Sequence, residues 1–180
     1  TTARLRDGWC RVLHGRRQMS RKPLSGESIE SFRMALQGFA VLASGLFAGV
    51  ALYVALIARA SWLRSVRSDV AVALSDFRFV FPRVIVLQGF LLVLGTVCSI
   101  GWWLKSGATA FLAGGALLGA VAPFTVLFVT PVYRRLLNPA TEAQPAEAER
   151  QLLRWAWLHL ARAALGLAAF GLLVASLVYR

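Results

Sequence analysis

Charged residues and metal-binding residues are scarce in this chain of 180 residues. Only 16% of the residues are charged, whereas soluble domains average about 25%. There are two cysteines and two histidines. Cys10 lies in a basic segment, Cys98 lies deep in an apolar run, and no CxxC spacing occurs. We therefore expect no disulfide, and we interpret Cys98 as a small buried apolar residue.

Four long apolar runs take up most of the chain, at residues 34–58, 84–104, 108–132 and 158–179. Each has about 20 residues or more, the length that crosses a hydrocarbon core roughly 30 Å thick. The runs are rich in Ala, Leu and Gly and lack the alternation of membrane strands. The sequence predicts an all-α fold, a four-transmembrane-helix bundle over residues 34–180, preceded by a basic N-terminal extension of residues 1–33.

The apolar runs leave little room for catalytic chemistry. They contain one histidine, one cysteine and no aspartate or glutamate. A haem held by two histidines and a di-iron carboxylate site are therefore excluded within one chain. The sequence has no HExxH, GxSxG or P-loop motif, and no acidic residue at depth for a proton pathway. We expect neither a metal nor a cofactor.

The net charge of +12 comes from 20 Lys and Arg against 8 Asp and Glu. In a membrane protein such a balance favours anionic phospholipids, including cardiolipin, and acidic partner subunits over nucleic acid, which we do not expect. The first 33 residues are rich in arginine and start at Thr1 rather than Met, a composition typical of import into an organelle. We expect the mitochondrial inner membrane.

The N-terminal extension has an apolar stripe at Leu5, Trp9, Val12 and Leu13. This spacing suits a helix lying in the membrane interface, although a solvated, mobile tail explains the composition equally well. The expected contacts with lipid or a partner come from six residues, namely Arg4, Arg6, Trp9, Arg11, Arg16 and Arg17.

Small residues at helical spacing occur in the first and third runs. Gly45 and Gly49 form a GxxxG pair, and Gly115 and Gly119 form another. Such pairs let helices approach closely. Packing within the chain's own bundle is the expected use, and contact with another chain is the alternative.

The last run carries Trp155, His159, Arg162 and Gly166 at steps of four, three and four, which places them on one face of a helix. One interpretation makes His159 a general base and Arg162 an anchor for an anionic or phenolic substrate. The other places them at the membrane interface, with Arg162 snorkelling to head groups and the tryptophans in the aromatic belt. We favour the interfacial interpretation and expect the same placement for Gln37 and Gln88.

Two prolines help to define the helices. Pro123, followed by Phe124 and Thr125, predicts a kink in the third run, with the Thr125 hydroxyl satisfying a freed carbonyl. Pro145 suits the first position of a helix, so the fourth helix is expected to begin there and run into the membrane. Residues 59–83 are long enough for a short amphipathic helix.

Three segments of the sequence resemble a known family. They are residues 45–53 (GLFAGVALY), residues 123–125 with the exit residues 131–137, and Trp155, Leu158, His159 and Arg162. In order and spacing they resemble the anthrone oxygenase-like family of small four-helix integral membrane proteins, over roughly residues 40–178. The family is mostly of unknown function, and some members are similar to enzymes that oxidise anthrones to anthraquinones with molecular oxygen.

The chain departs from this family at two places. Members usually carry a His-Pro pair just after the first helix, where this chain reads Arg59-Ala60-Ser61, and often an Asn where this chain has Tyr133. The groups that would hold a metal or substrate beside His159 are thus missing. This pattern indicates a scaffold that has kept the fold and lost the chemistry.

These observations lead to three hypotheses. The first is a non-catalytic accessory subunit of a larger membrane complex, of the respiratory-chain or ATP synthase type, acting by helix packing and lipid contacts. The second is an anthrone oxygenase-like enzyme for a phenolic or polyketide substrate. In it His159 is the base, Arg162 the anchor, and Thr125, Trp155 and Tyr133 line the pocket. The third is a homo-oligomeric carrier of lipids or small molecules.

Overall fold

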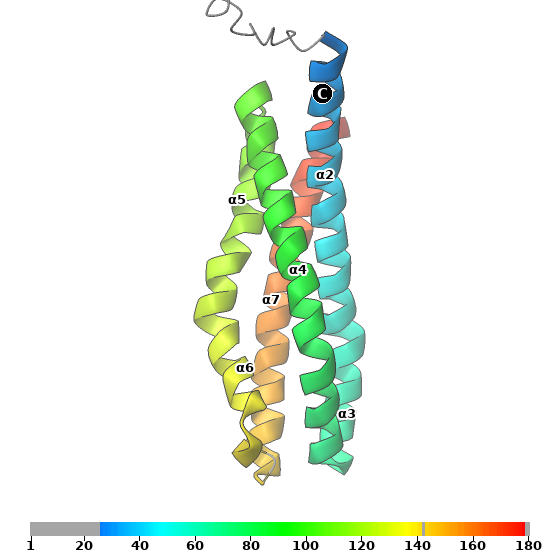
Figure 1. Cartoon of the computed structure of the whole chain (residues 1–180). Helices are drawn as coiled ribbons and strands as arrows, with labels where there is room; N and C mark the ends of the chain where they lie inside the picture. Colours follow the sequence, from blue (N-terminus) through cyan, green and yellow to red (C-terminus); the bar gives the residue numbers. More distant parts are fainter. Residues whose placement is uncertain (1–25, 142, 179–180) are drawn as a thin grey trace, which may run out of the picture. The chain divides into compact units, whose positions relative to one another are not determined.

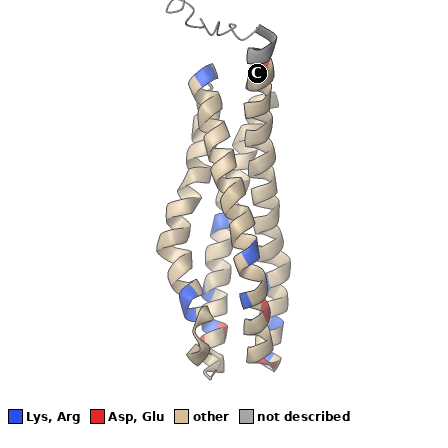
Figure 2. Cartoon of the chain, viewed as in Figure 1, with Lys and Arg blue, Asp and Glu red and all other residues tan. Residues whose placement is uncertain are grey.

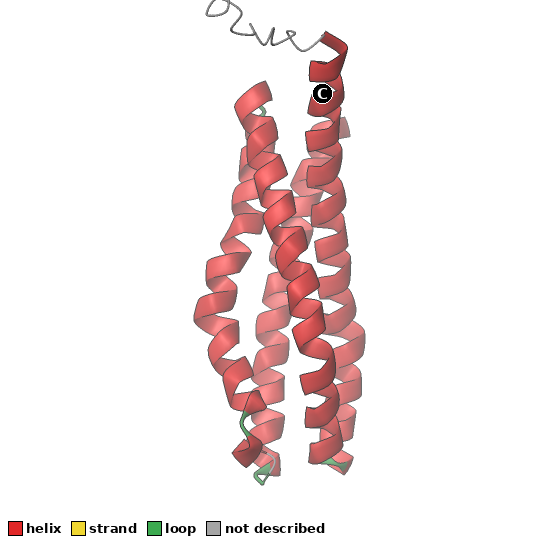
Figure 3. Ribbon diagram, viewed as in Figure 1, coloured by secondary structure: helices red, strands yellow, loops and turns green. Residues whose placement is uncertain are grey.

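The computed structural model describes residues 26–141 and 143–178, and every element in these ranges is a helix (Figure 3). The all-α prediction is confirmed. The chain divides into two compact units, Thr1–Ser31 and Phe32–Arg180, and the description below concerns the second. The elements are α2 (Gly26–Tyr53), η1 (Val54–Ala58), α3 (Arg59–Ser68), α4 (Val70–Ser106), α5 (Thr109–Phe124), η2 (Thr125–Val129), α6 (Thr130–Leu137), η3 (Pro139–Thr141) and α7 (Pro145–Val178). The segments η1 and η2 are π-helical and η3 is a 3₁₀ turn.

These elements join into four continuous rods that are long and apolar enough to cross a membrane (Figure 1). They are Glu30–Ser68, Val70–Ser106, Thr109–Leu137 and Pro145–Val178. The protein is therefore a multi-pass integral membrane protein. The first rod has 39 residues, or about 58 Å of helix, so it extends well past a core roughly 30 Å thick. Within residues 59–83, where the sequence predicts a short amphipathic helix, the structure has the short helix α3, which continues this rod, and the start of α4.

Charged side chains gather at one end of the bundle, where α3 ends and α4 and α7 begin (Figure 2). We call this the basic end; its arginines are Arg59, Arg64, Arg67, Arg78, Arg83, Arg134, Arg135, Arg150 and Arg154. Two exposed ion pairs lie there, with N–O distances of 3.0 Å between Arg67 and Glu149 and between Arg150 and Glu147. The charge marks this end as lying outside the hydrocarbon core.

Local sequence determines where the rods begin and end. Asp69 caps α4, its carboxylate accepting a hydrogen bond from the Val72 N–H at 3.1 Å. Gly107, at φ 70°, ends the same helix in the left-handed conformation that glycine adopts without strain. The last helix begins at Pro145, as predicted, with Glu147 in its first turn.

The basic end has a core of aromatic rings. We call Trp62, Phe77, Phe81, Tyr133 and Trp155 the aromatic cluster. Four of these side chains are at most 5% exposed, and Tyr133 is half-buried. Neighbouring rings in the cluster have centroids between 5.0 and 6.1 Å apart, mostly edge to face, which is a favoured geometry. The cluster joins α3, α4, α6 and α7.

Small residues dominate the packing toward the other end of the bundle. A Cβ atom on Gly45 would lie 2.9 Å from the Phe170 ring, and one on Gly115 would lie 2.9 Å from the Ser99 Cβ. Gly119 faces Thr96 at 3.3 Å, whereas a Cβ on Gly49 would meet nothing within 4 Å. Three of the four glycines singled out in the sequence therefore lie against neighbours in their own chain.

The third rod changes from α5 to the π-helical η2 directly after Pro123, and Figure 1 shows the rod bowing away from α4 near this point. A proline cannot donate its backbone hydrogen bond. The Thr125 hydroxyl donates to the Val121 carbonyl at 2.7 Å, a carbonyl that also accepts from the Thr125 N–H and is not the one freed by Pro123. The Thr130 hydroxyl donates to the Thr125 carbonyl at 3.1 Å. Thr125 and Val126, at the start of η2, line a pocket together with residues of α4.

Candidate functional site

The face of α7 singled out in the sequence points into the bundle. His159 is 0%, Trp155 1% and Arg162 2% exposed. Arg162 therefore does not snorkel outward, and Trp155 lies inside the bundle rather than on its outer surface, because α7 packs this face against the other rods. The aromatic-belt interpretation suits Trp157, which is 62% exposed, with the Arg59 guanidinium 5.4 Å from its ring centroid.

His159 lies between the aromatic cluster and the interior of the membrane-spanning part. Its ring stacks on Trp155 with centroids 4.9 Å apart and an interplanar angle of 19°, and it meets Phe81 edge on at 6.3 Å. The ring also lies against the backbone of Ala51 in α2, yet neither nitrogen makes a hydrogen bond of good geometry. Stacking on Trp155 thus holds the ring in place beside the Ala51 backbone.

Arg162 is a buried side chain whose charge has little compensation. Its guanidinium carbon lies 5.3 Å from the centroid of the Phe47 ring. Nε and Nη1 are buried without a hydrogen-bond partner, and no carboxylate in the described part of the chain pairs with the side chain. Removing a guanidinium from water without such a partner costs several kcal/mol. This arrangement favours an anionic ligand.

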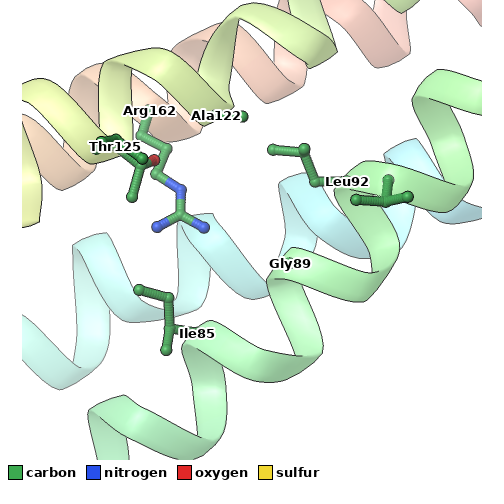
Figure 4. A pocket seen from close by; sticks show the side chains of 8 residues that line it. Ile85, Gly89, Leu92, Ala122, Thr125 and Arg162 are labelled. Atoms are coloured by element: carbon green, nitrogen blue, oxygen red, sulfur yellow. The ribbon is translucent and has the colours of Figure 1, made fainter.

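A pocket of about 230 Å³ lies beside Arg162, between α4 and the α5–η2 rod (Figure 4). We call it the lateral pocket; it is lined by Ile85, Gly89, Leu92, Val93, Ala122, Thr125, Val126 and Arg162. In Figure 4 the guanidinium projects from α7 toward α4, between Thr125 and Ile85. Val93 and Val126 at the rim are 59% and 66% exposed, so the pocket opens sideways, toward the lipid. Apart from Thr125 and Arg162, its wall is apolar.

The structure brings together only some of the residues that the sequence singled out. Thr125 and Arg162 share the lateral pocket. His159 is one helical turn from Arg162 but is not part of the pocket wall, and Trp155 and Tyr133 belong to the aromatic cluster. The selected arginines of the N-terminal extension and Trp9 lie outside the described residues.

Gln88, for which the sequence predicts an interfacial position, is fully buried inside the bundle. It lies in the middle of α4 and is 0% exposed. Neither Oε1 nor Nε2 has a hydrogen-bond partner. Its spacing from Ile85 and Leu92 could have indicated the inward face of the helix.

Among residues 26–141 and 143–178 there is no group of three or more His, Cys, Asp and Glu side chains that could hold a metal ion. Cys98 is a free, buried thiol, as expected. The chemistry that this part of the chain offers is that of a cation, an imidazole, an amide and a hydroxyl in an apolar setting.

A comparison with protein families gives one match, to a family described as anthrone oxygenase, over residues 77–172. The matched range includes Gln88, Thr125, His159 and Arg162. No curated protein and no solved structure matches the chain significantly. The match covers more than half of the sequence and confirms the resemblance to this family; it includes the motifs at residues 123–137 and 155–162, whereas residues 45–53 lie outside it.

Proposed function

Because the chain belongs to the anthrone oxygenase family, we propose that it is a membrane enzyme that oxidises a hydrophobic phenolic substrate bound in the lateral pocket. The observation that carries this proposal is the buried Arg162 guanidinium, which lines the pocket and lacks a carboxylate partner among the described residues. A planar phenol or anthrone supplies what the site lacks, an oxygen that can carry negative charge on an otherwise apolar body.

The family description implies a reaction in which the methylene carbon of an anthrone becomes a carbonyl. One oxygen atom of O₂ forms the new carbonyl, and the other leaves as water with the two methylene hydrogens. The carbon gives up four electrons and O₂ accepts four, so no further reductant is needed. The enolate of the anthrone is the electron-rich form that reacts with O₂, and forming it requires loss of a proton from the methylene carbon.

Arg162 would favour this enolate, because a guanidinium in a site without water stabilises an oxyanion far more than it stabilises a neutral ketone. In the proposal His159 accepts the methylene proton on an imidazole nitrogen. The ring lies outside the pocket wall, so this role requires the substrate to reach past Arg162. The anchoring role of Arg162 has no such requirement.

The test is the rate of anthraquinone formation by the purified protein in lipid nanodiscs, with anthrone as substrate and the protein-free rate subtracted. Replacing Arg162 with glutamine is expected to lower kcat/KM about a hundredfold, the usual cost of removing an oxyanion-stabilising donor. The matched control is Arg154→Gln, on an exposed position of the same helix, which should leave the rate unchanged. A rate equal to the protein-free rate, or one indifferent to Arg162, contradicts the proposal.

A second candidate, an accessory subunit of a larger complex of the mitochondrial inner membrane, is supported by the outer face of α2. A shallow apolar depression of about 400 Å³ lies there, lined by Ala35, Gly38, Phe39 and Leu42. Phe39 and Leu42 are 51% and 57% exposed, and a Cβ on Gly38 would meet nothing within 4 Å. Such a face suits a partner helix, and the arginines of the basic end suit anionic phospholipids such as cardiolipin.

Native gel electrophoresis of gently solubilised membranes tests this second candidate. A subunit is expected to migrate in a large band with consistent partners, and Gly38→Leu should release it because the new side chain fills the depression. Gly171→Leu is the control, since that position on α7 is also open. Migration as a lone chain of 19.6 kDa in detergent would count against the subunit role.

A further inference from the structure

We propose that Gly89 is a specificity-determining residue of the lateral pocket, which together with Ala122 limits the width of the ligand that can reach Arg162. This inference rests on the proposed function, because it concerns the same pocket, and it adds the residue that decides which ligands fit by size. It follows from the lack of any packing role for Gly89, from its place in the pocket wall and from the buried cation in the same pocket.

Neither the backbone nor the packing of α4 requires a glycine at position 89. Elsewhere in the same helix, a Cβ on Gly95 would lie 2.6 Å from a side-chain carbon of Leu118, whereas a Cβ on Gly89 would meet nothing within 4 Å. Among the residues that the structure describes, only Gly107 has a positive φ. Glycine destabilises the interior of a helix relative to alanine, so the fold does not explain the missing side chain at Gly89.

Gly89 forms a notch in the wall that α4 contributes to the lateral pocket. Ile85 and Val93, one turn away on either side, line the same wall, as does Leu92. All three have branched side chains, so this wall recedes only at Gly89. Gly89 itself is exposed, so the notch is accessible to a ligand.

The opposite wall of the pocket has a second small residue. Ala122 lines the pocket from α5, directly before Pro123, and is exposed as well. Figure 4 shows Gly89 and Ala122 on the two rods that enclose the pocket, with the Arg162 guanidinium projecting between these rods. Gly89 and Ala122 are the two smallest residues of the pocket wall, so side chains leave the most room for a ligand between them.

The Arg162 side chain indicates that a ligand occupies this room. It lines the same pocket, it is 2% exposed, and its Nε and Nη1 atoms have no hydrogen-bond partner. A buried guanidinium in this state favours an anionic group at the inner side of the pocket. The rest of the ligand then fills the space between Arg162 and the exposed rim at Val93 and Val126, and so it lies between Gly89 and Ala122.

The size of the pocket makes position 89 sensitive to small changes. The pocket volume of about 230 Å³ is below the roughly 300–1,000 Å³ of typical ligand sites. A leucine side chain at position 89 would take up much of this space, and its Cβ would meet no neighbour. Because the packing is not disturbed, alanine or leucine at this position should keep or raise the free energy of unfolding while it excludes the ligand.

The experiment measures ligand binding and turnover in lipid nanodiscs, with empty nanodiscs as the blank. The binding probe is 9-anthracenecarboxylate, a fluorescent tricyclic anion that does not undergo the oxidation, and the substrate is anthrone. Gly89→Leu is expected to lower both the affinity for the probe and kcat/KM for anthrone by at least about tenfold, and Gly89→Ala by a smaller factor. Gly49→Leu, at an open position on α2 outside the pocket, is the control and should change neither.

A double variant tests whether Gly89 and Ala122 limit the width together. Gly89→Ala adds one methyl group to the wall of α4, and Ala122→Gly removes one from the wall of α5. The combination is expected to bind the probe more tightly than Gly89→Ala alone, because it returns the lost width. A double variant that binds no better than Gly89→Ala contradicts the joint role of the two residues.

The outcomes separate this inference from the proposed function. If Gly89→Leu leaves probe binding unchanged, or if Gly89→Ala and Gly89→Leu both lower the free energy of unfolding, the inference is wrong. If probe binding depends on Gly89 and Arg162 but anthrone is not oxidised, the proposed function fails and the inference holds. If anthrone oxidation depends on Arg162 and not on Gly89, only the inference fails. A probe that does not bind, with no turnover of anthrone, contradicts both.

Discussion

Replacing Trp155 with alanine is expected to lower the free energy of unfolding by about 4 kcal/mol, as typical for a fully buried tryptophan. The side chain is 1% exposed and lies at the centre of the basic end. Its ring meets four others, at centroid distances of 5.5 Å from Trp62, 5.1 Å from Phe77, 5.0 Å from Phe81 and 4.9 Å from His159. Four elements converge there, so the surrounding residues cannot close the cavity without moving a helix.

The chain provides a matched control two residues away. Trp157 is 62% exposed and touches Arg59 through a cation–π contact, so Trp157→Ala should cost less than about 1 kcal/mol. The free energies of unfolding of both variants can be measured by SDS-induced unfolding in lipid bicelles. Far-ultraviolet circular dichroism is the readout, because each variant has lost a tryptophan fluorophore. If both variants lose a similar amount of unfolding free energy, the aromatic cluster does not stabilise the basic end.

Replacing Gly166 with leucine is expected to lower the free energy of unfolding by about 3 kcal/mol, because the new side chain overpacks the contact between α7 and α2. A Cβ at this position would lie 2.9 Å from two carbons of the Phe47 ring and 3.6 Å from the Ala48 Cα. The Phe47 ring is also 0% exposed and in contact with Arg162, so it cannot move without disturbing its neighbours, and the Ala48 backbone of α2 limits the rest of the new side chain. The substitution should therefore separate α2 from α7 at the layer that holds His159 and Arg162.

Gly171→Leu is the control for this substitution, on the same helix, because a Cβ there would meet nothing within 4 Å. SDS-induced unfolding, followed by tryptophan fluorescence, gives the difference in the free energy of unfolding between the two variants. In oxidation assays Gly166→Leu should also lose most activity, whereas Gly171→Leu should keep it. Equal stability of the two variants would mean that α2 and α7 are not closely packed at this depth.

Hydropathy was sufficient to predict the four rods. A run of about 20 apolar residues is too costly to expose to water, and a helix that crosses the membrane satisfies all of its backbone hydrogen bonds. The face that joins Trp155, His159 and Arg162 was equally predictable, since helical spacing alone determines it. The start of α7 at Pro145 followed from the chemistry of proline.

The direction in which that face points could not be predicted. All sides of α7 are apolar near Arg162, and an arginine near the end of a run can snorkel to the surface or turn inward. The inward direction of Arg162 depends on its contact with the Phe47 ring, which lies far away in the sequence. That ring fits against α7 because Gly166 has no side chain. The burial of Gln88 comes from contacts of α4 with other rods, and its immediate neighbours Leu87 and Gly89 are exposed.

The sideways opening of the lateral pocket, between Val93 and Val126, determines how concentration should be expressed for this protein. A substrate that enters there diffuses in two dimensions, so the quantity that the site senses is the mole fraction of substrate in the bilayer. That mole fraction follows from the partition coefficient and from the amount of lipid present. Adding lipid or detergent at constant total substrate would dilute the substrate within the membrane phase, and the apparent KM would rise in proportion although no contact in the site had changed.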